Sequence, residues 1–437
     1  MSTRTASYFA TPGGRVAGEI QVPGDKSISH RAAMLGSIAK GVTDIHGFLE
    51  GEDCLATLAA FAAMGVRIER PGPGHVRIHG AGMRGLRAAT TALDLGNSGT
   101  SMRLLTGLLC GQRFDSILIG DASLMRRPME RVATPLNRMG ANVLTNEGKP
   151  PIAIAGGRSL RGCEHRLELP SAQVKSAILL AGLQAIGRTT VLEPGPSRDH
   201  TENMLKAFGV AVAREKGSVS LEGPCSLAAT RIEMPGDFSS AAFFIVAGLM
   251  AGSAPLLIRG VGVNPTRTAL LDILRSMGGD IRLHRVADHG GEPVADIEVR
   301  PGALRGVSVP PSLVPIAMDE LPCLFAAAAV ADGDTVVTGA AELRIKETDR
   351  LAAMGEGLAA LGVAVEPLPD GLRVRGGTVT GGNVDSRGDH RVAMSFAVLA
   401  ARAQSPVTIR DVQNVATSFP GFVPTARAAG LRLAEEG

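Results

Sequence analysis

Two stretches 212 residues apart carry nearly the same sequence, I-Q-V-P-G-D-K-S at 20–27 and I-E-M-P-G-D-F-S at 232–239. In each, an extended run ends at Pro-Gly-Asp and an apolar helical run follows. Aspartate at this point is a favourable helix N-cap, because its side chain accepts a hydrogen bond from a free backbone N–H. The matched pair predicts a strand–turn–helix unit that occurs in both halves of the chain.

Weaker copies of this unit recur along the chain. Polar clusters precede apolar helical runs at steps of 65 to 84 residues, and they begin at Pro23, Gly96, Pro170, Pro235, Asp319 and Gly388. In a second series, a glycine ends a helical run before the next strand, where a left-handed cap favours this residue. These glycines are Gly65, Gly140, Gly209, Gly278, Gly362 and Gly430. Together the series predict six strand–helix–strand–helix–strand units.

Six units and one matched pair predict an α/β chain with two domains of three repeats each. Residues 1–22 and 236–437 are expected to form domain one and residues 23–235 domain two, with a two-strand hinge near 22–24 and 234–236. The uncharged stretch 239–258 is long enough to span a bilayer. Its glycines and proline, and its charged sister segments, favour a buried helix instead.

The composition argues against several classes of protein. The net charge is only +3, and 12 Phe, one Tyr and no Trp are too few for stacking on bases, so we expect neither nucleic acid nor membrane as a partner. The five cysteines lie far apart without a C-x-x-C pair, which fits a reducing compartment. No apolar signal region is found in residues 1–15, so the cytoplasm is the expected location.

Several of the polar clusters also carry cations. Helix N-termini attract anions, and capping explains serine, threonine and aspartate but not the cations Lys26, Arg31, Arg103, Lys175 and Arg391. A solvated surface charge is the alternative for each residue taken alone. As a set, they favour a cleft that binds a polyanionic small molecule without a metal.

Further segments carry charged residues that suggest anion binding or proton transfer. Arg126, Arg127 and Arg131 surround Pro128 and could clamp a phosphate or carboxylate. In E-L-R-I-K-E-T-D-R at 342–350, a helix would place Lys346 and Arg350 on one face beside Glu347, although a solvated ion-pair face has the same spacing. The carboxylates of 319–320 interrupt an apolar stretch and are candidates for proton transfer.

Seven motifs make the chain resemble the 5-enolpyruvylshikimate-3-phosphate synthase family over nearly its whole length. They are G-D-K-S-I-S-H-R-A at 24–32, L-G-N-S-G-T-S-M-R at 95–103, R-R-P-M at 126–129, S-A-Q-V-K-S at 171–176, D-E-L-P at 319–322, L-R-I-K-E-T-D-R-L at 343–351 and G-D-H-R-V-A-M at 388–394. The resemblance implies an inside-out α/β barrel in each domain, with helices inside a ring of sheets.

The resemblance also implies the reaction. The family transfers the enolpyruvyl group of phosphoenolpyruvate to the 5-hydroxyl of shikimate 3-phosphate and releases phosphate, which calls for no cofactor and no metal. Asp319, Glu347 and Lys26 are the implied proton-transfer residues. The implied shikimate 3-phosphate contacts are Lys26, Ser27, Arg31, Ser171, Ala172, Gln173, Asp319 and Lys346, and the implied phosphoenolpyruvate contacts are Lys26, Gly99, Arg127, Gln173, Arg350 and Arg391.

Four features bear on the class within the family. Arg198, near a place where many members have tyrosine, and Thr417, where many have lysine, resemble the second, glyphosate-tolerant class, as does N-P-T-R at 264–267. Arg198 is then expected to take part in the shikimate 3-phosphate site. Gly99 departs from that class, which often has alanine at this place, so we expect inhibition by glyphosate with partial tolerance.

Two alternatives stay open on the sequence. The related UDP-N-acetylglucosamine enolpyruvyl transferase shares the fold and the donor, but it uses Lys-Asn where this chain has Lys26-Ser27, and it carries a cysteine in a glycine-rich loop. A non-catalytic anion-binding scaffold of the same fold would not need the carboxylates Asp319 and Glu347 beside Lys26. The expected form is a monomer.

Overall fold

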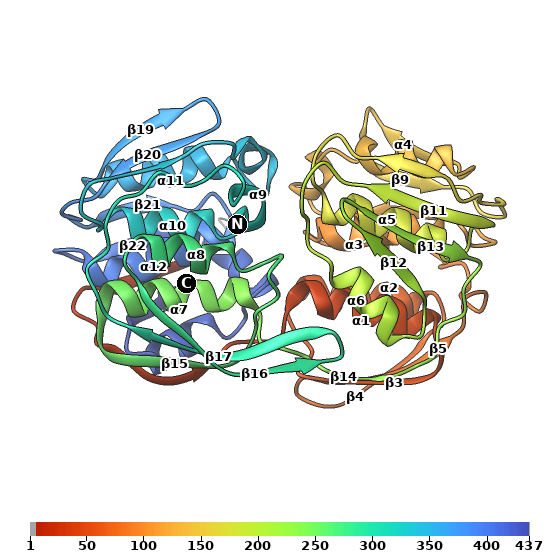
Figure 1. Ribbon diagram of the computed structural model, residues 1–437, viewed down its shortest axis with the longest axis horizontal. Helices are drawn as coiled ribbons and strands as arrows, with labels where there is room; N and C mark the ends of the chain where they lie inside the picture. The colour runs from red at the N-terminus through yellow and green to blue at the C-terminus, as the bar shows by residue number, and fades with distance from the viewer. Residues whose placement is uncertain (1–5, 437) are drawn as a thin grey trace. The chain divides into compact units, whose positions relative to one another are not determined.

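The computed structural model describes residues 6–436, which divide into two units (Figure 1). Unit 1 holds the described residues up to Pro23, Pro235–Ala287 and the described residues from Pro293 on. Unit 2 holds Gly24–Met234 and the short segment Asp288–Glu292, a hairpin tip that no sequence pattern indicated. The chain thus changes unit inside each of the two Pro-Gly-Asp motifs or directly before it.

Three four-stranded sheets form the outer layer of unit 2, all with one topology. The first strand pair of each is parallel and the next two pairs are antiparallel. The orders are β14-β3-β5-β4 (Arg231–Glu233, Lys40–His46, His75–Ala81, Arg67–Gly72), β6-β7-β9-β8 (Leu93–Asp94, Ser116–Ile119, Lys149–Ile154, Val143–Asn146) and β10-β11-β13-β12 (Glu164–Arg166, Gly187–Leu192, Ser218–Gly223, Val212–Glu215).

Three helices form the interior of unit 2, each against its own sheet. These are α1 (Lys26–Ile38), α3 (Gly99–Leu109) and α5 (Ala172–Gly182), which are buried over nearly their whole length. A β-carbon on Gly107 would lie 2.1 Å from the carbonyl oxygen of Ala177, so only glycine lets α3 and α5 approach so closely. The other helices are α2 (Glu52–Ala63), α4 (Glu130–Arg138) and α6 (His200–Ala207), with a short 3-10 turn η1 (Leu124–Arg126).

Unit 1 repeats the plan with helices α7 (Phe238–Ala251), α10 (Leu321–Ala328) and α12 (His390–Leu399) packed together inside. Its sheets are β16-β17-β15-β2 (Asp280–His289, Glu292–Arg300, Gly252–Gly262, Val16–Gln21), β21-β22-β1-β23 (Gly382–Asp385, Val407–Arg410, Ser7–Thr11, Arg432–Glu436) and β18-β20-β19 (Asp334–Val337, Gly371–Arg375, Ala364–Leu368). The remaining elements are α8 (Ala269–Ser276), α9 (Val314–Ala317), α11 (Arg350–Ala360), α13 (Phe422–Ala428), η2 (Ala341–Ile345), η3 (Ala400–Arg402) and η4 (Gln413–Thr417).

The predicted fold class is confirmed, with helices inside and sheets outside in both units. All six predicted cap glycines have φ between +82° and +97°, the left-handed backbone that ends a helix. The uncharged stretch is the buried helix α7 followed by strand β15. Within residues 6–436, no helix is long and apolar enough to cross a membrane.

Candidate active site

The start of α1 carries two predicted site residues of unit 2, Lys26 and Ser27. Asp25 caps the helix by accepting a hydrogen bond from a backbone N–H of the first turn at 2.9 Å. Lys26 is the first helical residue, its ammonium lies 2.5 Å from a carboxylate oxygen of Asp53, and its side chain is 20% exposed. Ser27 is half-buried. The helix N-terminus and this accessible ammonium together attract an anion.

Arg31 lies one turn further along α1 and is buried. Its Nε donates to Thr201 Oγ1 at 2.6 Å, Nη2 donates to Ser176 Oγ at 2.8 Å, and Nη1 donates to the carbonyl of Ser27 at 2.9 Å. Burial, the largest effect, and the charge of nearby Arg198 outweigh the opposing effect of acidic neighbours and lower the pKa of Arg31 to about 10. Arg31 therefore joins α1 to α5 and α6, and a substrate contact for it stays a prediction.

Two guanidinium groups converge on the start of α3. A β-carbon on Gly99 would lie 2.9 Å from Nη1 of Arg103 and 3.1 Å from Nη1 of Arg127. Arg103 donates to Gln173 Oε1 at 2.7 Å, and Arg127 donates to Asn97 Oδ1 at 2.6 Å. Three predicted residues, Gly99, Arg127 and Gln173, thus lie together. Arg103 and Asn97, which belong to the matched motif at 95–103, support them.

The start of α5 corrects one sequence interpretation. Ser171 caps the helix through its Oγ and Ala172 begins it, and both are half-buried. Lys175 was expected to bind an anion, but its ammonium is buried between carboxylates of Glu193 and Glu202, at 2.8 Å from each. That interpretation is wrong, because Lys175 neutralises two acidic side chains inside the protein.

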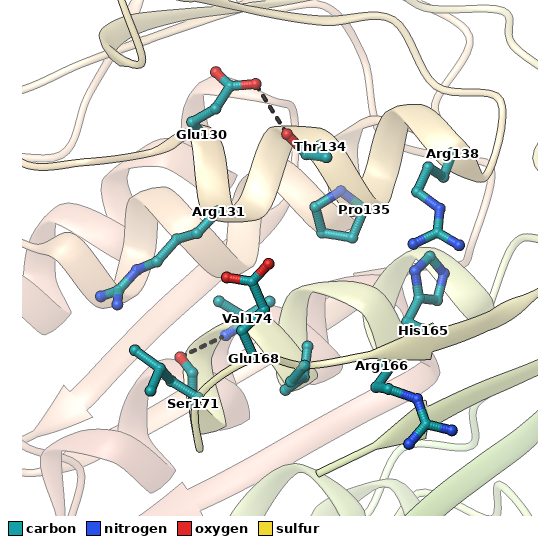
Figure 2. A pocket seen from close by; sticks show the side chains of 12 residues that line it. Glu130, Arg131, Thr134, Pro135, Arg138, His165, Arg166, Glu168, Ser171 and Val174 are labelled. Carbon is teal, nitrogen blue, oxygen red and sulfur yellow. Dashed lines mark hydrogen bonds between the residues drawn. The ribbon is translucent and has the colours of Figure 1, made fainter. Parts of the chain in front are cut away.

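The predicted clamp of three arginines is divided in the structure. Arg127 lies at the α3 start, Arg126 is exposed, and Arg131 on α4 lines a pocket of about 340 Å³. Figure 2 shows this pocket between α4 and the segment that leads from β10 into α5, with Glu168 projecting near Ser171. Its lining is Glu130, Arg131, Thr134, Pro135, Arg138, His165, Arg166, Leu167, Glu168, Leu169, Ser171 and Val174.

In unit 1, the predicted carboxylates gather around Arg350. Its Nη2 lies 2.6 Å from Glu347 Oε2, its Nε 2.7 Å from Asp389 Oδ2, and its Nη1 3.5 Å from Asp319 Oδ1. Lys346 Nζ is also 3.5 Å from Asp319 Oδ1. Burial alone would lower the pKa of Arg350, but the three carboxylates outweigh it and raise the pKa above its ordinary value. Arg350 therefore stays charged.

A helix through 342–350 would have put Lys346 and Arg350 on one face, but no helix within residues 6–436 contains both. Helix α11 begins only at Arg350, and Asp349 caps it by accepting from the N–H of Ala352 at 3.0 Å. Lys346 lies in the non-helical segment before the cap. The two residues still meet at Asp319 Oδ1, although they do not share a helix.

Arg391, at the start of α12, reaches the turn between α9 and α10. Its Nη1 donates to the carbonyl of Asp319 at 3.0 Å and lies 3.8 Å from Oε1 of Glu320. Its side chain is only partly buried. The predicted residues Asp319, Lys346, Glu347, Arg350 and Arg391 therefore form one cluster within unit 1.

At the second Pro-Gly-Asp motif, side chains of the protein itself occupy the surroundings of the helix start. Asp237 caps α7 by accepting from two backbone N–H groups. Ser239, the counterpart of Ser27, is buried, donates to Glu320 Oε1 and accepts from Arg267 Nη2 at 2.7 Å. The sequence did not predict this role for Arg267 and Glu320. The matched motifs were the signal that could have indicated it.

Thr417 lies at the end of η4 and is buried. Its Oγ1 donates to the carbonyl of Asn414 at 2.7 Å, and the amide of Asn414 donates to the carbonyl of Gly388 at 2.8 Å. The segment around Thr417 is therefore attached to the loop that leads into α12 and Arg391.

Comparison with known proteins identifies the family of the chain. The family model described as EPSP synthase (3-phosphoshikimate 1-carboxyvinyltransferase) matches residues 10–425. A 3-phosphoshikimate 1-carboxyvinyltransferase from Methylococcus capsulatus is 56% identical over 99% of both chains, and one from Nitrosococcus oceani is 54% identical over 99% of this chain and 98% of its own.

Solved structures give the same answer for the fold. EPSP synthase from Acinetobacter baumannii superposes with a TM-score of 0.89 at 49% identity, covering 99% of this chain and 100% of that one. The enolpyruvyl transferase NikO from Streptomyces tendae, at 19% identity and a TM-score of 0.79, shares the fold over 99% of both chains. By family model, sequence identity and fold, the chain belongs to the EPSP synthase (3-phosphoshikimate 1-carboxyvinyltransferase) family.

Proposed function

We propose that this chain performs the family's reaction with anion-binding helix starts in unit 2 and a carboxylate–arginine cluster in unit 1. The reaction transfers the enolpyruvyl group of phosphoenolpyruvate to the 5-hydroxyl of shikimate 3-phosphate and releases phosphate. The alcohol adds across the enol double bond, and phosphate then leaves a tetrahedral intermediate. The chemistry needs a base for the hydroxyl, an acid for the methylene carbon and cations for phosphates and carboxylates.

The cluster around Arg350 is the observation that carries this proposal. Asp319 and Glu347 are partly exposed carboxylates held by one buried, permanently charged guanidinium. Binding of anions alone does not require them, whereas proton transfer does. Fixing both carboxylates on a rigid cation reduces the reorganisation needed during the reaction. We assign them the two proton transfers, with Lys26 as a further candidate.

The remaining roles concern charge. Lys26, at a helix start and partly exposed, is suited to a ligand phosphate or carboxylate. Arg127 beside Gly99, with Arg350 and Arg391, would hold phosphoenolpyruvate, and Gln173 would contact both substrates. Shikimate 3-phosphate would be bound by Lys26, Ser27, Arg31, Ser171, Ala172, Gln173, Arg198, Asp319 and Lys346.

Release of phosphate from the purified full chain tests the function. We expect release only when both substrates are present, and none when UDP-N-acetylglucosamine replaces shikimate 3-phosphate. Glu347→Gln and Asp319→Asn should each lower kcat at least a hundredfold, because general acid–base catalysis contributes about 10²–10⁴ in rate. Glu356→Gln, an exposed carboxylate of unit 1 paired with Arg387, is the control and should keep wild-type kcat. Full activity of both site variants would contradict the assignment.

We further propose that the chain is of the second, glyphosate-tolerant class and acts as a cytoplasmic monomer. Arg198 beside Arg31 supports this class, and so does Thr417 in the segment attached to the α12 loop. The two compact units would be its domains, with the chain crossings near 23 and 235 as the hinge. Glyphosate titration at fixed phosphoenolpyruvate tests the class, and light scattering of the purified chain tests the monomer.

A further inference from the structure

The solvent-facing side of one sheet in unit 2 carries a group of side chains that the reaction does not use. In the pair β3–β5, His46 lies opposite His75, and Asp44 lies two residues before His46 on the same strand. The alternate residues Ile45 and Val76 are buried against the helices. Strand alternation therefore places Asp44, His46 and His75 together on the outer face of the sheet that contains β3 and β5.

The three side chains converge on a small volume. One oxygen of Asp44 lies 2.8 Å from His75 Nε2, and the other lies 3.1 Å from His46 Nε2. The two imidazole rings stack with their centroids 4.3 Å apart. Each of the three residues can offer one ligand atom within 4.8 Å of the others, and all three are partly exposed. A solvent ion can therefore reach them.

We propose that Asp44, His46 and His75 bind a divalent transition metal, with Zn²⁺ as the best-suited ion. Two imidazole nitrogens and one carboxylate oxygen are a set of ligands that zinc takes in proteins, at about 2.0–2.2 Å from the metal, with water in the fourth place. Such bond lengths put ligand atoms roughly 3.3–3.5 Å apart in a tetrahedral site. The Asp44 oxygens already lie 2.8 and 3.1 Å from the imidazole nitrogens, and a separation at the 4.8 Å limit would have to close by about 1.3–1.5 Å, which rotation of the partly exposed side chains provides.

Arg77 is the competitor of the metal. Its Nε donates to the same carboxylate oxygen of Asp44 as His75 does, at 3.0 Å. A metal bound through this oxygen would compete with the guanidinium for it, and the two positive charges repel each other. Arg77→Ala should accordingly strengthen zinc binding.

A bound ion would cross-link two strands next to the first Pro-Gly-Asp turn. His46 is the last residue of β3, and Gly47 follows it. A β-carbon on Gly24 would lie only 1.9 Å from the carbonyl oxygen of Gly47. The turn before α1 therefore packs closely against the end of β3. Because the metal binds the folded state, it should raise the melting temperature of the protein.

Calorimetric titration of the full chain with ZnCl₂, after treatment with chelator, tests the site. We expect saturable binding that His46→Ala, His75→Ala and Asp44→Asn each weaken at least tenfold. His79→Ala is the matched control, since His79 lies on the same strand and face but pairs with Glu69 at 3.1 Å. Phosphate release in all variants should equal wild type, which shows that they fold.

The test compares the zinc affinity of each variant with that of wild type and does not depend on the total amount of zinc bound. Cys163 Sγ lies 3.2 Å from His165 Nε2, so this pair can also take up zinc. Binding that is the same in wild type, His46→Ala and His75→Ala overturns the proposal, and so does an increase in melting temperature with zinc that survives both substitutions.

Discussion

Replacing Gly99 by alanine should weaken the binding of glyphosate, the proposed inhibitor, more than the binding of the substrate phosphoenolpyruvate. The new methyl group would lie 2.9 Å from Arg103 Nη1 and 3.1 Å from Arg127 Nη1, whereas ordinary contact begins at 3.4 Å. The guanidinium groups must therefore move by about 0.3–0.5 Å. Arg127 is also held by Asn97 Oδ1 at 2.6 Å, so its movement strains a charge-assisted hydrogen bond.

The size of the effect follows from these contacts. Overpacking costs about 1–3 kcal/mol, and the low end applies here because the displaced atoms end flexible side chains. About 1 kcal/mol corresponds to roughly a fivefold change in affinity. We expect the KM for phosphoenolpyruvate to rise about fivefold. We propose that glyphosate, which is longer than phosphoenolpyruvate, would occupy the space that the methyl group enters, so its inhibition constant should rise at least tenfold more.

Steady-state phosphate release at varied phosphoenolpyruvate and glyphosate measures both constants. Gly355→Ala is the control, because a β-carbon there meets only Leu372 at 3.5 Å and Val365 at 3.8 Å, which is ordinary contact. If Gly99→Ala raises the two constants by the same factor, or leaves both unchanged, then Gly99 does not line the space that distinguishes the ligands.

Lys26→Met should reduce turnover below a tenth of wild type while the circular dichroism spectrum stays unchanged, because methionine keeps the stem of the side chain but removes its charge. With a thiol reagent at pH 8, the native chain should react at Cys163 and Cys225, and at all five cysteines only in denaturant. The reason is that Cys54, Cys110 and Cys323 are buried, and burial raises the pKa of Cys110 to about 12. Burial and the charge of Arg138 lower the pKa of His165 to about 4, so the stability that depends on its neutral form is present above pH 6.5 and is lost as the pH falls towards 4. His165→Gln should therefore make the melting temperature less dependent on pH between 6.5 and 4. Glu320→Leu should lower the stability of unit 1 by about 1–3 kcal/mol, seen in calorimetry, because it removes the acceptor of the buried Ser239 hydroxyl and one of the two carboxylates near Arg267, of which Asp237 at 3.5 Å remains.

Much of the fold could be predicted because each repeat has local signals at both ends. An aspartate or serine cap and a glycine with positive φ depend on only a few neighbouring residues, so Asp25, Asp237 and Gly65 were readable from the sequence. The place of the helices inside the sheets was available only through the resemblance. A helix that is apolar on all sides, such as α7, has no periodicity that points to a neighbour.

The site was predictable to the extent that its residues belong to short motifs. Spacing could not tell a helix interior from the segment before a cap, and so Lys346 was placed on a helix that begins at Arg350. It also could not show that Lys175 has Glu193 and Glu202 as partners, because these residues lie 18 and 27 positions further along the chain. Ion pairs between distant segments are a property of the folded chain.

The buried helix start at Asp237 has a consequence for how the two halves tolerate change. The two Pro-Gly-Asp helix starts share a sequence pattern, but Ser27 is half-buried, whereas Ser239 is buried and donates a hydrogen bond to Glu320. Substitutions at Ser27 and at Ser239 should then belong to different phenotypes, altered substrate affinity for the first and reduced protein abundance for the second. A mutational scan that scores both traits would distinguish a helix start at which substitution changes ligand affinity from one at which it mainly changes protein abundance.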